Sequence, residues 1–575
     1  MIVYRNYRQP VPVKECSSRI RKIIGRIRGQ LYPDYQDVIS LLIECGELET
    51  GITDFLFPDR DSIFSARTEM LRKLSLIAGR VVCRLWERQK LDRGEIDKAE
   101  EMLSEIESWE IRSILLSVPE GFAYYSLYPE AYIEAACRFR GRISTESVLV
   151  IGLRSIGTSL SSLVSAQLEL MGCSVKSFTL RPRGHPFSRS AQIDKETEEY
   201  ISGCKNSFIA VVDEGPGLSG SSLGGTLEML RGIGLTEERT VIFPSWIPDS
   251  NRFINRNARE LWPRYRKFVG SFDQLWVESG RLQSSFGMKI ERDLSAGMWR
   301  YLHYSSEKDY PGVHHHHERR KYLLRGDNTY FLAKFAGLGR YGIDLAERAE
   351  KFTGTGFCPA VEKISDGFVV MEYLDGRPVR PDDVNDKFLE RAASYCAFIR
   401  NHFPSSLTVT LDEMQEMILE NVREGIGVEW CKRVESACDA AVEYYGMEPV
   451  EIDGRMMPHE WILTDKGIFK TDHLEHHSDQ FFHGSQNIAW DIAGFCEEFG
   501  LSRQQRDVFT EMYMGKTGDT LLRKRLPFFT VAYLAFHLGY VSLAVDSLRG
   551  SDDCGRFEKL KNRYKERLQE MLLNY

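Results

Sequence analysis

Residues 208–222 read Phe-Ile-Ala-Val-Val-Asp-Glu-Gly-Pro-Gly-Leu-Ser-Gly-Ser-Ser, and this stretch decides the fold of the first half of the chain. The five apolar residues predict a buried strand that delivers two adjacent carboxylates, Asp213 and Glu214, into a loop of small residues. Small residues let consecutive backbone N–H groups close on an anion, and a helix expected from about 223 to 232 adds its positive N-terminus. We therefore expect a sugar-phosphate site in which the two acids bind ribose hydroxyls or a hydrated Mg²⁺.

A second apolar strand, residues 147–153, also ends in a loop of small residues, which contains Arg154, Ser155, Gly157 and Thr158. A long apolar helix follows to about residue 171, and then a strand over 175–180. The next segment, 181–189, holds three arginines and a histidine among two prolines and a glycine. This composition predicts a mobile, cationic loop beside the anion site.

The order of these elements resembles the phosphoribosyltransferase family, whose fingerprint is an apolar strand, two acids, a short spacer and then Thr-Gly with a small hydroxyl residue. Here Ser219-Gly220-Ser221-Ser222 stands where Thr-Gly begins, and the spacer is one residue longer. The resemblance implies a parallel-sheet fold that transfers ribose 5-phosphate from phosphoribosyl pyrophosphate to a base-like acceptor, which the sequence does not identify. The alternative is a Gly-rich strand-to-helix turn of an unrelated α/β protein.

By that resemblance, Asp213 and Glu214 are the catalytic acids, which bind the ribose hydroxyls and a solvated Mg²⁺. Mg²⁺ and cationic groups are needed to stabilise the leaving pyrophosphate. The 5-phosphate is expected at the backbone and hydroxyls of the following loop. Pyrophosphate is expected at the first loop and the basic segment. The expected phosphate ligands are Ser219, Gly220, Ser221 and Ser222, and the expected pyrophosphate ligands are Arg154, Ser155, Gly157, Thr158 and Arg183.

Length and composition indicate two or three domains of ordinary globular type. The chain has 575 residues, 42% hydrophobic and 27% charged, and its net charge of −8 predicts no general affinity for nucleic acid. The twelve cysteines show no Cys-x-x-Cys pair, which favours reduced thiols of a cytoplasmic protein. Residues 526–548 are nearly apolar but contain Pro527, His537 and Asp546, so we expect a buried helix and no membrane span. Homo-oligomers are possible.

The second half contains a different pattern. A predicted hairpin over 322–335 places Lys334 inside its second strand, and a helix with Glu347 and Glu350 follows. With the strand and hinge over 368–378, which include Glu372, these elements resemble the aminoglycoside phosphotransferase and protein-kinase-like superfamily. The resemblance implies that Lys334 meets the phosphates of ATP, paired with Glu347 or Glu350, and that Glu372 lies at the nucleotide-binding hinge.

Residues 458–472 correspond to the catalytic strip of that superfamily, with departures. His459 fits the motif and the strand-end Asp472 fits a metal ligand, but Trp461 stands at the position expected for the base. One expectation is that Glu460 replaces the missing base, because a carboxylate near the acceptor hydroxyl can take its proton. The alternative is that this half has lost catalysis and senses nucleotide or binds a partner. Asp491 is expected to be structural and to brace the catalytic loop.

A run of ligand-type residues follows Asp472, and two interpretations of it stay open. In the first, Glu460, Asp472 and Asp479 form a non-standard metal site together with His476 or His483. In the second, this run is a surface segment whose histidines are merely polar.

The sequence thus predicts an α/β N-terminal half, built on a parallel sheet with a helical cap, and an α+β kinase-like C-terminal half. The expected domains are a helical region over 1–118, with helices such as 66–89 and 96–116, then 119–300 and 301–575. One function hypothesis is a bifunctional enzyme of nucleotide or nucleoside-like metabolism that uses Mg²⁺ and ATP. The other is a regulatory protein whose first half senses a phosphoribosyl ligand and whose degenerate kinase lobe binds nucleotide or a partner.

Overall fold

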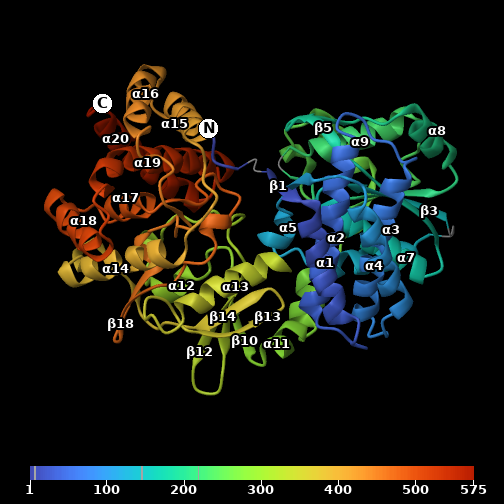
Figure 1. Cartoon of the computed structure of the whole chain (residues 1–575), viewed down its shortest axis with the longest axis horizontal. Helices are drawn as coiled ribbons and strands as arrows, with labels where there is room; N and C mark the ends of the chain where they lie inside the picture. The colour runs from blue at the N-terminus through green and yellow to red at the C-terminus, as the bar shows by residue number, and fades with distance from the viewer. Residues whose placement is uncertain (6–7, 144–146, 218) are drawn as a thin grey trace. The chain divides into compact units, whose positions relative to one another are not determined.

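The structure is a computed structural model that describes residues 1–5, 8–143, 147–217 and 219–575, so Leu218 of the loop quoted above lies outside the described residues (Figure 1). The chain is a mixed α/β protein with a parallel sheet, antiparallel sheets and many helices. It divides into two compact units. The N-terminal unit comprises Tyr7–Gly287 and Gly337–Ile343, and the C-terminal unit comprises Met1–Asn6, Met288–Ala336 and Asp344–Tyr575.

The N-terminal unit is built on a five-stranded parallel sheet of order β4-β3-β7-β8-β9. Its central strands are nearly continuous apolar runs because helices cover a parallel sheet on both faces. All strands point the same way, so the loops after β3, β4, β7 and β8 meet at one edge of the sheet, where ligands of such sheets bind. The strands are β3 (Ser147–Leu153), β4 (Ser174–Leu180), β7 (Phe208–Val212), β8 (Thr240–Phe243) and β9 (Arg266–Lys267).

Helices connect these strands and surround the sheet, and the basic segment forms a hairpin. The helices of this part are α5 (Glu120–Ala123), α6 (Glu130–Arg140), α7 (Ile156–Leu170), α8 (Lys195–Gly203), α9 (Ser221–Gly232), α10 (Arg256–Leu261) and α11 (Arg281–Phe286). The hairpin consists of β5 (Pro182–His185) and β6 (Ser188–Ala191), which pair antiparallel. The predicted cationic loop is therefore an ordered hairpin.

The N-terminal helical region belongs to the same compact unit as the sheet. Its helices are α1 (Val13–Ile27), α2 (Tyr35–Leu56), α3 (Ala66–Trp86) and α4 (Arg93–Glu107). The expected helix to residue 116 ends earlier, because Glu110 has φ 59° and residues 113–117 alternate between exposed and buried. That period of two is the pattern of a strand, and β2 (Ser113–Ser117) pairs antiparallel with β1 (Arg8–Pro12).

The C-terminal unit contains a five-stranded antiparallel sheet of order β10-β11-β12-β14-β13. The predicted hairpin is confirmed as β11 and β12, and β12 is the central strand. The strands are β10 (Lys289–Asp293), β11 (Lys321–Arg325), β12 (Tyr330–Phe335), β13 (Val361–Ser365) and β14 (Phe368–Glu372). Helices α12 (Arg300–His303) and α13 (Arg340–Phe352) lie in the connections of this sheet.

The rest of this unit is mainly helical around one large apolar core. The helices are α14 (Asp386–His402), α15 (Leu411–Gly425), α16 (Cys431–Ala441), α17 (Ala489–Glu498), α18 (Arg503–Thr517), α19 (Leu522–Ser547) and α20 (Asp552–Leu572). Two small sheets accompany them, with strands β15 (Arg377–Pro378), β16 (Pro449–Val450), β17 (Trp461–Thr464), β18 (Gly467–Lys470) and β19 (Gln486–Asn487).

Helix α19 is long and apolar enough to cross a membrane by length and composition, and it contains all but the last residue of the segment 526–548. In the structure, 83% of its most apolar 18-residue window is buried. Its side chains pack into the core of the C-terminal unit. The prediction of a buried helix is confirmed, and a cytoplasmic location stays a prediction.

Candidate functional site

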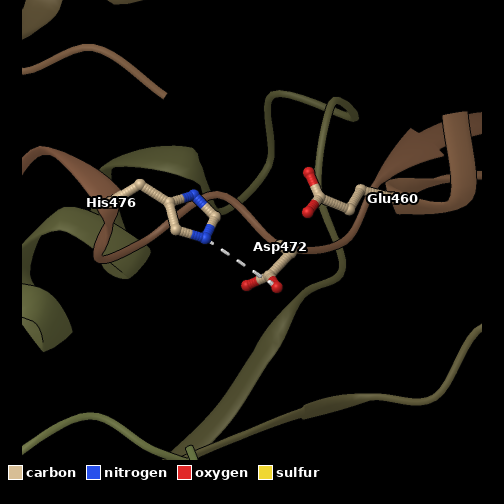
Figure 2. Close-up of side chains that lie close together, drawn as sticks. All are labelled: Glu460, Asp472 and His476. Carbon is tan, nitrogen blue, oxygen red and sulfur yellow. Dashed lines mark ion pairs between the residues drawn. The ribbon is translucent and has the colours of Figure 1, made fainter. Parts of the chain in front are cut away.

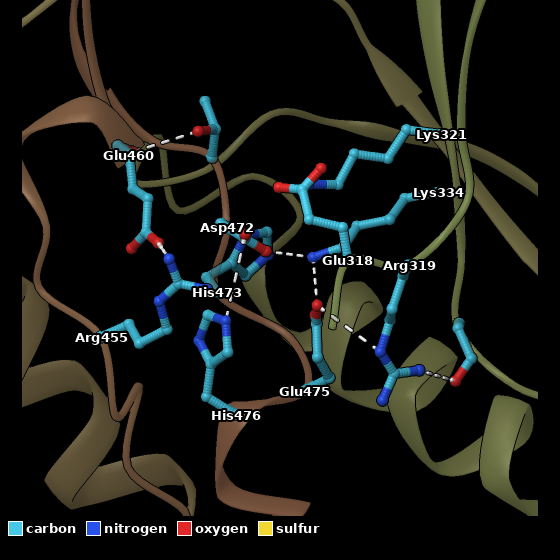
Figure 3. Close-up of polar contacts among 12 residues, drawn as sticks. Glu318, Arg319, Lys321, Lys334, Arg455, Glu460, Asp472, His473, Glu475 and His476 are labelled. Atoms are coloured by element: carbon cyan, nitrogen blue, oxygen red, sulfur yellow. Dashed lines mark hydrogen bonds and ion pairs between the residues drawn. The ribbon is translucent and has the colours of Figure 1, made fainter. Parts of the chain in front are cut away.

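Lys334 lies on the central strand β12 and its side chain is only 4% exposed. A buried ammonium without a partner is costly, so the structure pairs it twice. Its Nζ forms ion pairs with Asp472 and with Glu475, as Figure 3 shows. Burial lowers the pKa of Lys334, but the two carboxylates outweigh burial and raise the pKa above its ordinary value. Lys334 is therefore a fixed positive charge.

The predicted pairing of Lys334 with a helical glutamate is wrong. Glu347 and Glu350 are exposed on α13, whose buried positions are instead filled by residues such as Leu345 and Ala349. Helical periodicity alone turns both glutamates away from the sheet. Among the described residues the partners of Lys334 come from the loop after β18. Glu475 is a site residue that the sequence reasoning missed, although it lies in the run of ligand-type residues after Asp472.

Asp491 braces the loop that precedes β17, as the sequence predicted. Its two carboxylate oxygens accept hydrogen bonds from the backbone N–H groups of Asp453 and Gly454, each at 2.8 Å. Burial and the neighbouring Asp453 carboxylate raise the pKa of Asp491 to about 7. This brace directs the loop so that Arg455 lines the cleft described below.

Trp461, which the sequence placed at the position of the base, is a core residue. It begins β17, is 1% exposed, and packs edge-to-face on Phe388 and Tyr395 with ring centroids 5.4 and 5.5 Å apart. The strand alternates its side chains, so the cleft receives the neighbours Glu460 and Ile462 and not the indole. Trp461 therefore supplies no group to the cleft, in keeping with the absence of the usual base at this position.

Glu460 is buried beside two positively charged groups, Lys470 and Arg455. Its Oε2 accepts a hydrogen bond from Lys470 Nζ at 3.0 Å, and Arg455 Nη2 lies 3.2 Å from its Oε1. Lys470 also pairs with the buried Asp453, at 3.1 Å. Burial raises the pKa of Glu460 above its ordinary range, while Lys470 and Arg455 oppose that shift.

Glu460, Asp472 and His476 each place one ligand-type atom within 4.8 Å of the other two, which suits a metal ion (Figure 2). His476 Nε2 lies 4.0 Å from Asp472 Oδ2. Asp479 is not part of this group, because its carboxylate accepts a hydrogen bond from Arg319 Nη2 at 2.8 Å. His483 packs instead against the aromatic rings of Trp490 and Phe536. The structure thus brings together three of the five residues that the sequence grouped as metal ligands.

Lys334, Arg455, Glu460 and Asp472 line a cleft that opens to solvent. Glu372 is at its edge, at the end of β14, and pairs with Lys466 at 3.2 Å. His459 lines it and stacks on Trp299, with ring centroids 5.5 Å apart. The remaining lining includes Leu294, Lys321, Leu332, Pro359, Tyr373, Leu374, Ile462 and Thr471.

In the N-terminal unit, Asp213 and Glu214 follow β7 at the carboxyl edge of the sheet, as predicted. Burial raises the pKa of Asp213 to about 6, against the opposing effects of the Glu214 backbone N–H and Arg189. Burial also raises the pKa of Glu214 to about 8, and repulsion from Glu120 and Asp213 adds to that shift. Three carboxyl groups thus meet at the strand end, an arrangement that favours a cation or a proton.

The expected phosphate cradle is closed by the β5–β6 hairpin. Ser219 Oγ and Ser221 Oγ donate hydrogen bonds to the Pro186 carbonyl at 2.9 and 2.6 Å. Arg189 Nη1 donates to Ser222 Oγ at 3.0 Å. Gly220 caps α9 with φ 64°, a conformation that glycine adopts without strain. An anion at the N-terminus of α9 would therefore meet hydroxyls that now bind the hairpin.

The arginines expected to face pyrophosphate are engaged elsewhere. Arg154 is buried and pairs with Asp54 at 2.9 Å and with Asp61. Arg183 donates to Asp61 Oδ1 at 2.9 Å and to the Pro58 carbonyl at 2.8 Å. The long-range partner Asp61 could not be anticipated from the local sequence, because it lies about 90 residues before Arg154.

The loop after β3 packs tightly against the loop after β7. Ser155 has φ 131°, unusual for a residue with a side chain. A Cβ on Gly157 would lie 2.8 Å from the Val212 carbonyl oxygen, so only glycine fits there. Thr158 is fully buried and its hydroxyl lies 2.8 Å from that of Thr50. These three residues shape the sheet edge, and their contact with pyrophosphate stays a prediction.

Comparison with known proteins gives matches among solved structures only. No protein-family model matches the chain, and no curated protein matches it. The choline kinase LicA from Streptococcus pneumoniae is 14% identical, with a TM-score of 0.34 over 44% of this chain and 90% of that chain. The macrolide 2'-phosphotransferase MphH from Brachybacterium faecium is 12% identical, with a TM-score of 0.33 over 51% and 98%. The GDP complex of aminoglycoside 2'-phosphotransferase-IIIa is 13% identical, with a TM-score of 0.32 over 52% and 99%.

Proposed function

We propose that the C-terminal unit is a kinase-like phosphotransferase that binds ATP in the cleft lined by Lys334. The observation that carries the proposal is the position of Lys334, a charged lysine on the central strand, beside Asp472 in a cleft that Glu460 also lines. A buried lysine on a strand is rare without a function or a partner, and here it reaches an open cleft. A nucleotide triphosphate supplies the negative charge that this arrangement favours.

Each group has a role in that proposal. Lys334 and Arg455 are positive groups for the phosphates, since charge-assisted contacts to phosphate are among the stronger hydrogen bonds. Apolar residues such as Leu332 and Ile462 suit the flat faces of a base, with Glu372 and the neighbouring backbone at its edge. A divalent metal held by Asp472 and Glu460 would neutralise phosphate charge. Glu460 serves this role better than that of a base, because Lys470 already holds one of its oxygens.

The experiment is equilibrium binding of Mg-ATP to the full chain by calorimetry, followed by measurement of ADP release. We expect one binding site in the micromolar to millimolar range. Ile462→Trp, which fills the cleft, should abolish binding, and the matched substitution Leu407→Trp at an exposed position should not. Absence of binding in the wild-type protein, or equal binding in Ile462→Trp, contradicts the proposal.

We also propose that the N-terminal unit binds a sugar phosphate at the carboxyl edge of its parallel sheet. The supporting observation is the meeting of Asp213, Glu214 and the N-terminus of α9 at that edge. Phosphoribosyl transfer from phosphoribosyl pyrophosphate to a base-like acceptor is the enzymatic form of this proposal. Sensing of a phosphoribosyl ligand is the regulatory form, and the engagement of Arg154 and Arg183 with Asp61 favours it.

Calorimetry with phosphoribosyl pyrophosphate and Mg²⁺ distinguishes these outcomes. Binding with release of pyrophosphate in the presence of cell extract supports transfer, and binding without release supports sensing. Asp213→Asn with Glu214→Gln should remove Mg²⁺-dependent binding. Unchanged binding in that double variant would contradict the site.

A further inference from the structure

We propose that Glu460, Asp472 and His476 form a three-ligand site for a divalent transition-metal ion of the Fe²⁺, Co²⁺ or Zn²⁺ kind, in preference to Mg²⁺ and without nucleotide. The inference rests on the proposed function in that it names the metal of the same site. Glu460 and His476 are buried and Asp472 is partly exposed, and their ligand-type atoms lie within 4.8 Å of one another.

The orientation of His476 is the first argument. Its Nδ1 lies 3.0 Å from the Asp453 carbonyl oxygen, and because a carbonyl only accepts, Nδ1 carries the proton. In the neutral ring, this contact fixes the tautomer in which the Nε2 lone pair is free, as in the outer hydrogen bonds of metal-bound histidines. Nε2 points toward Asp472 and has no hydrogen-bond partner among the described residues (Figure 2). A side chain that is 4% exposed therefore aims an unpartnered nitrogen into the cluster.

The carboxylates supply the second argument, because each keeps one oxygen for a ligand. Lys470 holds Glu460 Oε2, and the buried Glu460 Oε1 makes no hydrogen bond among the described residues. Lys334 holds Asp472 Oδ1, which leaves Oδ2 facing His476 (Figure 3). The two lysines also fix the directions of the free oxygens. Ligands of a tetrahedral ion lie about 3.4 Å apart, so the 4.0 Å separation of Nε2 and Oδ2 needs only a small contraction.

Lys334, Lys470 and Arg455 all carry positive charge near the site, and Arg455 is the one that lies beside the free oxygen of Glu460. Its guanidinium lies 3.2 Å from Glu460 Oε1 without hydrogen-bond geometry, and 39% of its side chain is exposed. A bound cation would therefore displace Arg455 toward solvent, where its length allows it to move. Removal of this competing charge should tighten metal binding, which a purely structural cluster would not show.

The ligand set determines the preference among metals. Mg²⁺ takes oxygen ligands and keeps several waters, whereas an imidazole nitrogen with two carboxylates suits transition metals. Loss of the imidazole should therefore weaken the binding of a transition metal much more than the binding of Mg²⁺. That difference separates a ligand role of His476 from a purely structural one.

The test titrates Co²⁺ and Mg²⁺ into the metal-free full chain, without nucleotide and with a non-thiol reductant, by calorimetry and visible absorption. We expect one Co²⁺ bound at least tenfold more tightly than Mg²⁺, with d–d bands and without a thiolate charge-transfer band. His476→Gln should weaken the binding of Co²⁺ at least tenfold and the binding of Mg²⁺ less than threefold. His402→Gln, on the exposed face of α14, is the matched control and should change neither.

Arg455→Ala provides a second measurement that does not depend on the folding of the His476 variant. It should tighten Co²⁺ binding severalfold. Equal affinities for Co²⁺ and Mg²⁺ in the wild type, or unchanged Co²⁺ affinity in a folded His476→Gln, overturn the proposal. Nucleotide binding is measured in separate titrations with Mg²⁺, so absence of ATP binding with Co²⁺ binding intact would contradict the proposed function and leave the metal site standing.

Discussion

Asp491 and Gly454 are joined by a hydrogen bond of 2.8 Å, in which the buried carboxylate accepts the backbone N–H at the start of the loop that carries Arg455 and Glu460. The other oxygen of Asp491 accepts the N–H of Asp453, also at 2.8 Å. One side chain from α17 thus fixes the direction of the loop that forms one wall of the cleft. The brace therefore helps to position this wall of the cleft.

We predict that Asp491→Ala destabilises the C-terminal unit by about 2–4 kcal/mol, because two buried N–H groups lose their acceptor. Asp491→Asn keeps one carbonyl oxygen and should cost less. Denaturant unfolding of both variants measures the difference. The exposed Asp412→Ala on α15 serves as the control. Equal stability of Asp491→Ala and wild type would show that the loop is held by other contacts.

We predict that Lys334→Ala weakens ATP binding by roughly 10- to 100-fold, which corresponds to a lost charge-assisted contact of about 1.5–3 kcal/mol. Glu475→Gln should also weaken binding, because Glu475 helps to orient Lys334. Glu347→Gln should have no effect, since Glu347 is exposed and away from the lysine. Calorimetric titration of the three variants checks this order. A large effect of Glu347→Gln would restore the helical glutamate as the partner of Lys334.

The raised pKa of Glu214 predicts that the stability of the N-terminal unit depends on pH. Its pKa in the folded protein is raised to about 8, so the stability from the protonated carboxyl is present at acidic pH and is lost as pH rises from about 4.5 through 8. Glu214→Gln keeps a neutral side chain and should raise the free energy of unfolding on the order of 2 kcal/mol at pH 9, and hardly at pH 5. Thermal unfolding at the two pH values measures this. An equal gain in the free energy of unfolding at both pH values would show that the effect comes from packing and not from ionisation.

Asp61 links Arg154 and Arg183, and its removal leaves a buried guanidinium short of charge compensation. We predict that Asp61→Ala destabilises the N-terminal unit by about 3–5 kcal/mol. Arg154→Met in the same chain should recover part of that loss, because the uncompensated charge is then gone. A double-mutant cycle in denaturant gives the coupling. Additive losses in the double variant would show that the two residues act independently.

The sequence predicted several local elements well, because apolar periodicity and turn residues act over a few neighbouring positions. The strand at 208–212 with its acidic end, the hairpin carrying Lys334 and the buried helix near 526–548 all follow from such patterns. The brace by Asp491 was also predicted, from a motif at the start of its helix. The cluster of Glu460, Asp472 and His476 was anticipated only as one of several sets of ligands.

Partners distant in sequence were decided by the tertiary structure alone. Lys334 meets Glu475 because β12 and the loop after β18 converge, while helical phase turns Glu347 outward. Arg154 is neutralised by Asp61 from a turn of the helical region, and Trp461 is buried by packing on Phe388. Charge pairing and burial depend on which segments fold together, and no local pattern encodes that. The sequence therefore determined which chemical groups are available, and the fold determined which of them face one another.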